Sequence, residues 1–380
     1  MKSNLKSLFL TFLIMTMFVL LLGTASFGLE KVRIGIIPYQ DSYPFILADH
    51  LGYYEEEGIE PVFEQLLFFP DVHEALAANA LDIGPTESAV YVAAYKSYPD
   101  LVMAFPFHVF HHGFSIMIKP DSDLKSYQEI LSEVGDPNKA LELTGAQLKS
   151  KTGIAMRGTD QEMPIWSLAK IAGLDLDNDI NMIDMQPDEG VTAFIAGTGD
   201  FFAGGIPQRM AALKNGMKEM ITVADIGGGV VCAPMMAVTK KYAEENWDTL
   251  VKLFHIYIKT CQYMSVHLNE AAEFISGELN KNTAAGMTPQ DFIDIFDKWQ
   301  AFPSSLVEWG YWIGPIEGNL SVESSWLTGK LPRYSQTERW EKVNDYLIER
   351  GMIQERVPIE GHFIYDQLFL DVLDKYGPKG

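Results

Sequence analysis

Two stretches of the chain repeat one order of strand and helix signals, and this repeat limits the folds open to it. Residues 31–39 (KVRIGIIPY) form a short apolar run rich in β-branched residues and ended by Pro38, which predicts a buried strand. Helix, strand, helix and strand signals then alternate up to residue 85. Such an order requires a parallel sheet with right-handed crossovers.

The same order returns at residues 151–208. Both stretches place a glycine and an aspartate 47 positions apart: Gly35 and Asp82 in the first, Gly153 and Asp200 in the second. Any two β-α-β-α-β units share this order, so a coincidental likeness is the alternative to a duplication. We expect the fold class to be α/β, with two similar lobes.

Extended apolar segments with glycines follow each repeat, at 105–123 and 221–242. We expect them to cross between the lobes and to act as a hinge. From about residue 243 the pattern becomes helical, and large rings gather between Trp299 and Trp326. The predicted organisation is a signal peptide at 1–28, lobe 1 at 29–110, lobe 2 at 111–226, a return to lobe 1 at 227–270, and a helical C-terminal extension at 271–380 packing on lobe 1.

The first 28 residues have the pattern of a secretory signal peptide. Lys2 and Lys6 precede an uncharged apolar run at 8–22, and small residues with a cleavage site near 25–28 follow. An uncleaved anchor is the alternative, because the apolar run approaches the length that spans a bilayer. The pattern predicts export, with the mature chain in the periplasm.

Charge and cysteine content exclude several classes of function. The chain has 29 Lys and Arg against 51 Asp and Glu, a net charge of −22, and such a polyanion repels phosphate backbones. Nucleic acid is therefore not a predicted partner. Cys232 and Cys261 lack metal-ligand spacing, and the sequence leaves open whether they pair. His108 and His112 share one face of an extended segment, and two ligands are fewer than zinc normally uses. No metal, cofactor or catalytic residue is predicted.

Several motifs together resemble one family. The stretch IGIIPYQDSYPFILADHLGYYEEEGIEP (34–61), the helix and strand of EALAANALDIG (74–84), and IWSLAKIAGLD (165–175) resemble the periplasmic substrate-binding proteins of ABC importers. The similar branch handles nitrate, sulfonates, taurine and thiamine precursors. The resemblance covers roughly residues 31–265. Residues 136–151 depart from it and look like an insertion.

The resemblance implies a type II periplasmic binding protein fold, in which lobes joined by crossover strands close on a small molecule. It implies a monomer that delivers a polar or anionic organic ligand to ABC permease subunits in the membrane. A thiamine-pyrimidine-synthase-like enzyme and an extracytoplasmic sensory subunit are alternatives on the same fold.

Ligands in parallel α/β lobes bind beyond the carboxyl ends of the strands, where helix N-termini offer free N–H groups. This rule predicts a site built from loops of both lobes and the crossover. Its predicted members are Tyr39, Gln40, Asp41, Tyr43, Phe69, Thr86, Glu87, Ser88, His111, His112, Arg157, Thr159, Asp160 and Gln208.

Two of these residues would decide the ligand's charge. Arg157 follows a predicted strand, where its guanidinium can grip a carboxylate, sulfonate or phosphate at two points. A salt bridge to a surface acid is the alternative. Glu87 selects amines or hydroxyls if it faces the cleft, and otherwise only complements a helix dipole.

Other candidates have structural alternatives. Asp71, Thr86 and Asp160 have the residue types and positions of helix N-caps. Phe68 and Phe69 fall on opposite faces of a predicted strand, so at least one of them is expected in the core.

Overall fold

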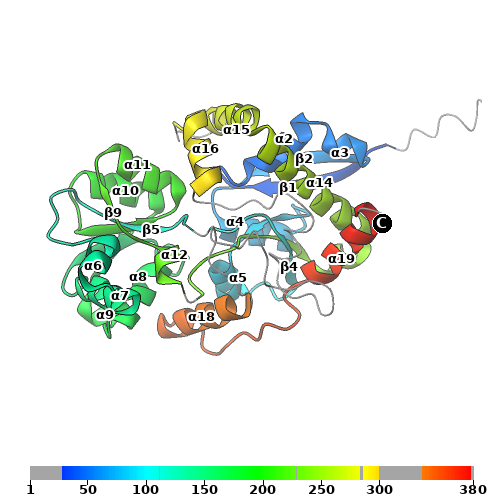
Figure 1. Ribbon diagram of the computed structural model, residues 1–380. Coiled ribbons are helices and arrows are strands. Elements are labelled where there is room, and N and C mark those ends of the chain that lie inside the picture. The colour runs from blue at the N-terminus through cyan, green and yellow to red at the C-terminus, as the bar shows by residue number, and fades with distance from the viewer. Residues whose placement is uncertain (1–27, 111, 228, 283–285, 299–335, 378–380) are drawn as a thin grey trace, which may run out of the picture.

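The computed structural model describes residues 28–110, 112–227, 229–282, 286–298 and 336–377 (Figure 1). The predicted signal peptide and the rings between Trp299 and Trp326 lie outside these ranges. Within them, no helix has both the length and the apolar character needed to cross a membrane.

The sheet of lobe 1 takes strands from both ends of the fold. Its strands are β1 (Glu30–Ile36), β2 (Ile59–Gln65), β3 (Gly84–Thr86), β4 (Leu101–Pro106) and β10 (Met235–Thr239). β1 pairs with β2 in parallel, and a parallel bridge from Ile34 to Ile83 places β1 beside the chain that enters β3. β10 runs antiparallel between β3 and β4. The resulting order is β2-β1-β3-β10-β4.

Lobe 2 repeats this order. Its sheet runs β7-β6-β8-β5-β9. Its strands are β5 (Ser115–Ile118), β6 (Thr152–Ala155), β7 (Asn181–Asp184), β8 (Phe201–Gly204) and β9 (Lys218–Thr222). β6 is parallel to β7 and β8, whereas β5 is antiparallel to β8 and β9. The predicted pair of similar α/β lobes is confirmed, and each lobe receives its antiparallel strand directly after a crossover.

One aspartate in each lobe makes the same contact, which explains why the sequence repeat places an aspartate in both lobes. The Arg33 N–H donates to Asp82 Oδ2 at 2.7 Å, and the Thr152 N–H donates to Asp200 Oδ2 at 2.7 Å. Each aspartate N–H bonds back to the carbonyl of the same residue, at 3.0 and 2.7 Å. The two aspartates are therefore structurally equivalent. The two glycines are not, because Gly35 lies two residues after Arg33 whereas Gly153 lies one residue after Thr152.

Helices cover the sheets, and the first of them end at glycines. Gly52 and Gly58, with φ of 78° and 75°, end the first helices in the left-handed region that disfavours other residues. Lobe 1 has α2 (Tyr43–His50), α3 (Tyr53–Glu56), α4 (Phe69–Ala77) and α5 (Ser88–Ala94). Lobe 2 has α6 (Tyr127–Val134), α7 (Pro137–Ala146), α8 (Met163–Ile171), α9 (Leu176–Asp179), α10 (Pro187–Ile195), α11 (Ile206–Lys214) and α12 (Val223–Ile226).

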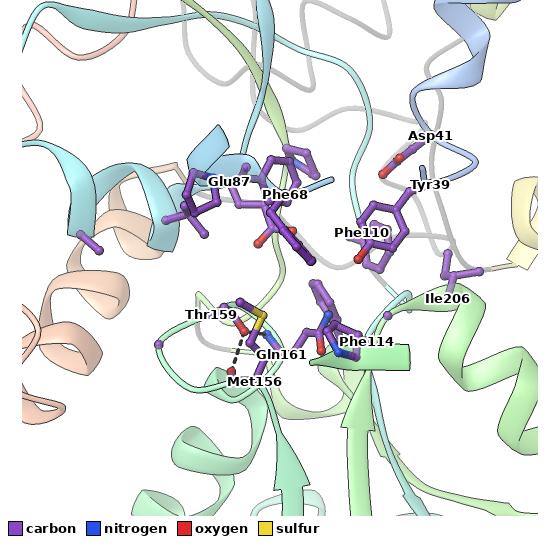
Figure 2. A pocket seen from close by; sticks show the side chains of 18 of the residues that line it. Tyr39, Asp41, Phe68, Glu87, Phe110, Phe114, Met156, Thr159, Gln161 and Ile206 are labelled. Atoms are coloured by element: carbon purple, nitrogen blue, oxygen red, sulfur yellow. Dashed lines mark hydrogen bonds between the residues drawn. The ribbon is translucent and has the colours of Figure 1, made fainter. Parts of the chain in front are cut away.

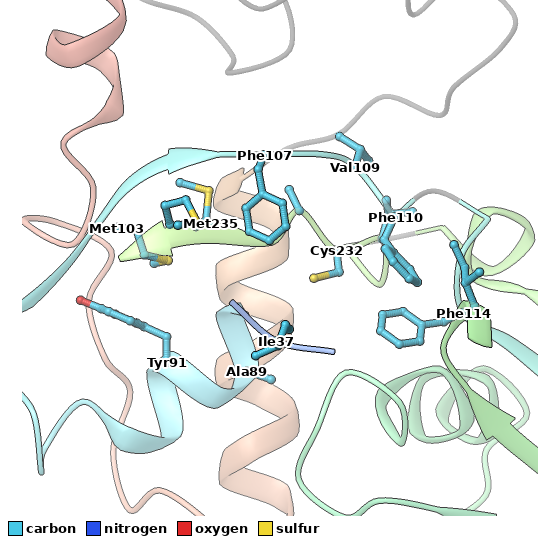
Figure 3. Packing of buried hydrophobic residues seen from close by; sticks show 14 of the residues in the cluster. Ile37, Ala89, Tyr91, Met103, Phe107, Val109, Phe110, Phe114, Cys232 and Met235 are labelled. Carbon is cyan, nitrogen blue, oxygen red and sulfur yellow. The ribbon is translucent and has the colours of Figure 1, made fainter. Parts of the chain in front are cut away.

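The two crossover segments lie side by side between the lobes. The Phe107 N–H donates to the Pro234 carbonyl at 3.1 Å, and the Phe110 N–H donates to the Cys232 carbonyl at 2.8 Å. Figure 3 shows buried side chains continuing from the core of lobe 1 along this segment to Phe114. The rings of Phe110 and Phe114 lie 4.6 Å apart, so an apolar seam runs through the crossover.

The C-terminal helices contact both lobes. They are α13 (Lys240–Glu245), α14 (Trp247–Val266), α15 (Leu268–Asn282), α16 (Pro289–Lys298), α18 (Gln336–Glu349) and α19 (Tyr365–Tyr376). α18 packs on α5 of lobe 1, with Tyr91 and Trp340 rings 6.1 Å apart. Its Arg339 also forms an ion pair with Asp160 of lobe 2. The extension was predicted to pack on lobe 1, but α18 reaches across to lobe 2 as well (Figure 1).

Candidate functional site

A cavity of about 350 Å³ lies between the lobes and takes its lining from both (Figure 2). Helix starts and loops at the carboxyl ends of the parallel strands supply most of this lining. Lobe 1 contributes Tyr39, Asp41, Phe68 and Glu87; the crossover contributes Phe110 and Phe114; lobe 2 contributes Met156, Thr159, Gln161 and Ile206.

Half of the predicted site residues line this cavity. Each follows the carboxyl end of β1, β2, β3 or β6, where the general rule for α/β lobes places ligands. They are Tyr39, Gln40, Asp41, Phe69, Glu87, Arg157 and Thr159. Their part in binding stays a prediction.

Three predicted residues of lobe 1 point elsewhere. Tyr43 begins α2, and its side chain is buried in the core. Thr86 Oγ1 lies 2.7 Å from the buried His73 Nε2, and Ser88 is buried in the first turn of α5. Thr86 is also not an N-cap, because Glu87 occupies that position of α5.

The remaining predicted residues also fall outside the lining. His112 Nδ1 lies 3.1 Å from Thr222 Oγ1, in a separate polar hollow of lobe 2. Gln208 donates to Asp188 Oδ1 at 2.7 Å. Asp160 pairs with Arg339, and Glu162 rather than Asp160 occupies the N-cap of α8. His111 lies outside the described residues.

The prediction that Phe68 and Phe69 lie on opposite faces of one strand is wrong. They do not share a strand, because α4 begins at Phe69 with Pro70 as its second residue. Phe68 is the N-cap residue, and both rings line the cavity. Asp71 is therefore not the N-cap; it lies one turn further in and accepts the Phe68 N–H at 3.1 Å. The Phe-Phe-Pro sequence was the signal for this helix start.

Several lining residues were not predicted at all. Phe110 and Phe114 lie on the crossover, and Met156 precedes Arg157 on the loop after β6. Met352 comes from the chain beyond α18. Local patterns gave no sign of Met352, because its approach depends on how the C-terminal extension packs.

Buried carboxyl groups dominate the electrostatics of the cavity. Burial raises the pKa of Asp41 to about 7, and Asp41 Oδ2 lies 3.3 Å from His108 Nε2. Burial also lowers the pKa of His108 well below its usual value, so that imidazole is neutral at pH 7. Burial and then the neighbouring Asp160 raise the pKa of Glu87. No cluster of three metal-ligating side chains occurs in the described ranges.

Behind Glu87, a buried polar cluster connects lobe 2 to α18 and the crossover. The Asp160–Arg339 pair is fully buried, and Arg339 also donates to the carbonyls of Gly229 and Val230 at 3.1 Å. Cys232 Sγ lies 3.0 Å from Asp160 Oδ2. Cys232 and Cys261 are both buried, free thiols, which answers the question of pairing that the sequence left open.

A second buried cluster holds the cavity loop of lobe 2, residues 156–161. The Arg350 guanidinium binds the Glu162 carboxylate at two points, with N–O distances of 3.1 and 3.0 Å. Tyr346 Oη donates to Glu162 at 2.6 Å, and the Gly158 N–H donates to it at 3.2 Å. Residues of the C-terminal extension thus fix the position of a loop that lines the cavity.

Comparisons with known proteins place the chain in a family. A sequence model of the NMT1-like family matches residues 27–276. The chain belongs to the NMT1-like family. The match stops before α16 and α18, so Met352, Arg339 and Arg350 lie outside the matched part of this NMT1-like protein.

Individual relatives are distant in sequence. A putative aliphatic sulfonates-binding protein of Bacillus subtilis is 24% identical over 253 residues, covering 65% of the NMT1-like chain and 69% of the relative. The periplasmic aliphatic sulphonate binding protein SsuA from Escherichia coli has a TM-score of 0.64 at 15% identity, covering 88% of this chain and 91% of that one. The desulfurization enzyme DSZB has a TM-score of 0.59 at 9% identity, covering 91% and 99%. The fold is that of the periplasmic binding proteins.

Proposed function

We propose that this NMT1-like protein is the extracytoplasmic solute-binding protein of an ABC importer. The observation that carries the proposal is the cavity lined by side chains of both lobes. Relatives named as sulfonate-binding proteins share the family or the fold. The proposed setting is the periplasm, with the chain as a monomer that docks on permease subunits.

Capture follows from the two-lobe geometry. A ligand between Phe68 of lobe 1 and Met156 of lobe 2 touches both walls only when the lobes are closed. It therefore shifts an open–closed equilibrium towards the closed form. The paired crossover segments are the connections about which the lobes turn.

A cavity-filling variant tests this proposal. Ala93 of α5 lines the cavity, and a tryptophan there occupies ligand space. Ala78 lies exposed at the end of α4, so Ala78→Trp is the matched control. A small molecule released from the purified wild-type protein by unfolding should be identified by mass spectrometry and added back. At 100 times its Kd it adds about 2.7 kcal/mol of stability. Wild type and Ala78→Trp should gain this stability and Ala93→Trp should not; equal gains in all three would contradict the proposal.

An enzyme is the second candidate, favoured by the similarity to the desulfurization enzyme and by the Asp41–His108 pair at the cavity wall. The two functions differ in the fate of the bound molecule. A solute-binding protein releases the molecule it captured with unchanged mass, whereas an enzyme releases a product. Incubation of excess released compound with the protein, followed by mass spectrometry, decides between them.

A further inference from the structure

Carboxyl groups gather around Tyr39 at the cavity wall. Burial raises the pKa of the Tyr39 hydroxyl, and the carboxylates of Asp188, Glu87 and Asp41 raise it further. Three acids thus act on one hydroxyl in the cavity wall. Among the described residues of the lining, Arg157 is the one Lys, Arg or His side chain, and it is exposed. A compact anion entering this cavity therefore finds one exposed cation, and it meets repulsion from Asp41 once that carboxyl is ionised.

Three of the helix starts in the lining have fewer N–H donors than usual. Pro70, Pro187 and Pro207 stand at the first or second positions of α4, α10 and α11, and all three line the cavity. Proline has no N–H, so each of these N-termini lacks one of its free donors. Asp71 and Asp188 already place carboxylates in the first turns of α4 and α10, where they complement the helix dipoles. These ends are poorly suited to bind an oxyanion.

Buried oxygen atoms in the lining lack partners. Within the described ranges, Gln40 Oε1, Asp41 Oδ1 and Gln161 Oε1 have no hydrogen-bond partner. Gln40 and Asp41 are only 1% and 6% exposed, and both line the cavity. A buried acceptor without a partner costs about 1–3 kcal/mol. A ligand that brings N–H donors removes this cost.

Aromatic rings form part of the apolar wall. Phe68, Phe69, Phe110 and Phe114 line the cavity together with Tyr39 (Figure 2). Flat apolar surfaces of this kind pack against a planar ligand, and their π faces also attract cations.

We infer that the captured solute is a flat, largely apolar molecule carrying an amine or amidine group, with that group directed to Asp41 and Glu87, rather than a compact oxyanion. This inference rests on the proposed function and deepens it. It sets the ligand class of this chain apart from the sulfonates for which the relatives are named.

Benzamidine and benzoate form a matched pair of probes, since both are flat and of similar size but opposite charge. Calorimetric titration at about pH 8 keeps Asp41 ionised. We expect benzamidine to bind at least about tenfold more tightly than benzoate, and methanesulfonate and nitrate to bind more weakly still. Asp41→Asn should weaken benzamidine about tenfold, as the loss of a charged hydrogen bond does. Glu87→Gln should weaken it less, because burial and Asp160 raise the pKa of the Glu87 carboxyl. Asp123→Asn, at an exposed site of lobe 2, is the control.

Any one of three results would overturn the inference. The first is a preference for benzoate, methanesulfonate or nitrate, the second is an absence of benzamidine binding, and the third is a benzamidine affinity unchanged in both carboxyl variants. Binding of an anion in place of benzamidine would leave solute capture standing. If none of the four probes binds and the purified protein releases no small molecule on unfolding, the proposed function is contradicted as well.

Discussion

Replacing Arg350 with methionine removes the cation from a buried carboxylate while keeping most of the side-chain volume. In the folded chain Arg350 and Glu162 have side-chain exposures of only 3% and 2%, and two N–O contacts of 3.0–3.1 Å join them. Breaking a buried pair by deleting one partner costs about 3–5 kcal/mol. Tyr346 and the Gly158 N–H still donate to Glu162, so the lower end, about 3 kcal/mol, is expected.

Arg356 provides the matched control. Arg350 pairs with Asp177 as well as with Glu162. Arg356 likewise pairs with two carboxylates, those of Glu341 and Asp345, but all three side chains are about half exposed. Arg356→Met should therefore cost less than about 1 kcal/mol. Urea unfolding followed by both fluorescence and circular dichroism measures each loss and checks that the two signals coincide.

The pair itself is isolated by a double variant. Glu162→Gln in the Arg350→Met background removes the uncompensated charge and should recover at least about 1 kcal/mol. The reasoning fails if Arg350→Met costs no more than Arg356→Met, or if the double variant is the least stable of the set.

Three further predictions concern Asp41, Arg157 and the two cysteines. Burial raises the pKa of Asp41 to about 7, so the stability contributed by its protonated form is full below about pH 4 and is lost as the pH rises to about 7. Over this interval Asp41→Asn should gain up to about 4 kcal/mol of unfolding free energy relative to wild type. Parallel pH profiles of the two proteins in urea unfolding would contradict this prediction. Arg157→Ala should change benzamidine affinity less than about threefold, whereas a more than tenfold loss for an acidic ligand, the outcome expected from the sequence, would return Arg157 to an anion site. Cys232 and Cys261 should resist a thiol reagent until urea is added, since burial raises the pKa of both thiols; rapid labelling of the folded chain would contradict their placement.

The order of strands and helices could be read from the sequence because its signals are local. Glycines with positive φ, such as Gly52, end helices wherever they stand in the fold, and apolar runs predict buried strands. The same locality explains why cavity residues directly after strands were found. It also explains the error at Phe68: the helix begins at Phe69, two residues before the aspartate that looks like its cap, because Pro70 is compatible with the first turn.

Contacts between distant parts of the chain could not be read in this way. Asp160 and Arg339 are 179 positions apart, and nothing in either segment marks the other as its partner. Asp160 has the residue type of a helix cap, and its burial against α18 is a tertiary feature. The approach of Met352 to the cavity depends on the same packing. The ligand's charge class is a similar case, because it depends on burial that brings Asp41, Glu87 and three prolines together.

Native mass spectrometry of the purified protein tests the central claim most directly, because it weighs the protein together with whatever it holds. The account predicts one small molecule per wild-type chain, released on unfolding at the mass it had before capture, and an empty Ala93→Trp variant. A molecule retained equally by Ala93→Trp, or one whose mass changes while it is bound, would contradict the claim that a cavity between the lobes captures a solute and leaves it intact.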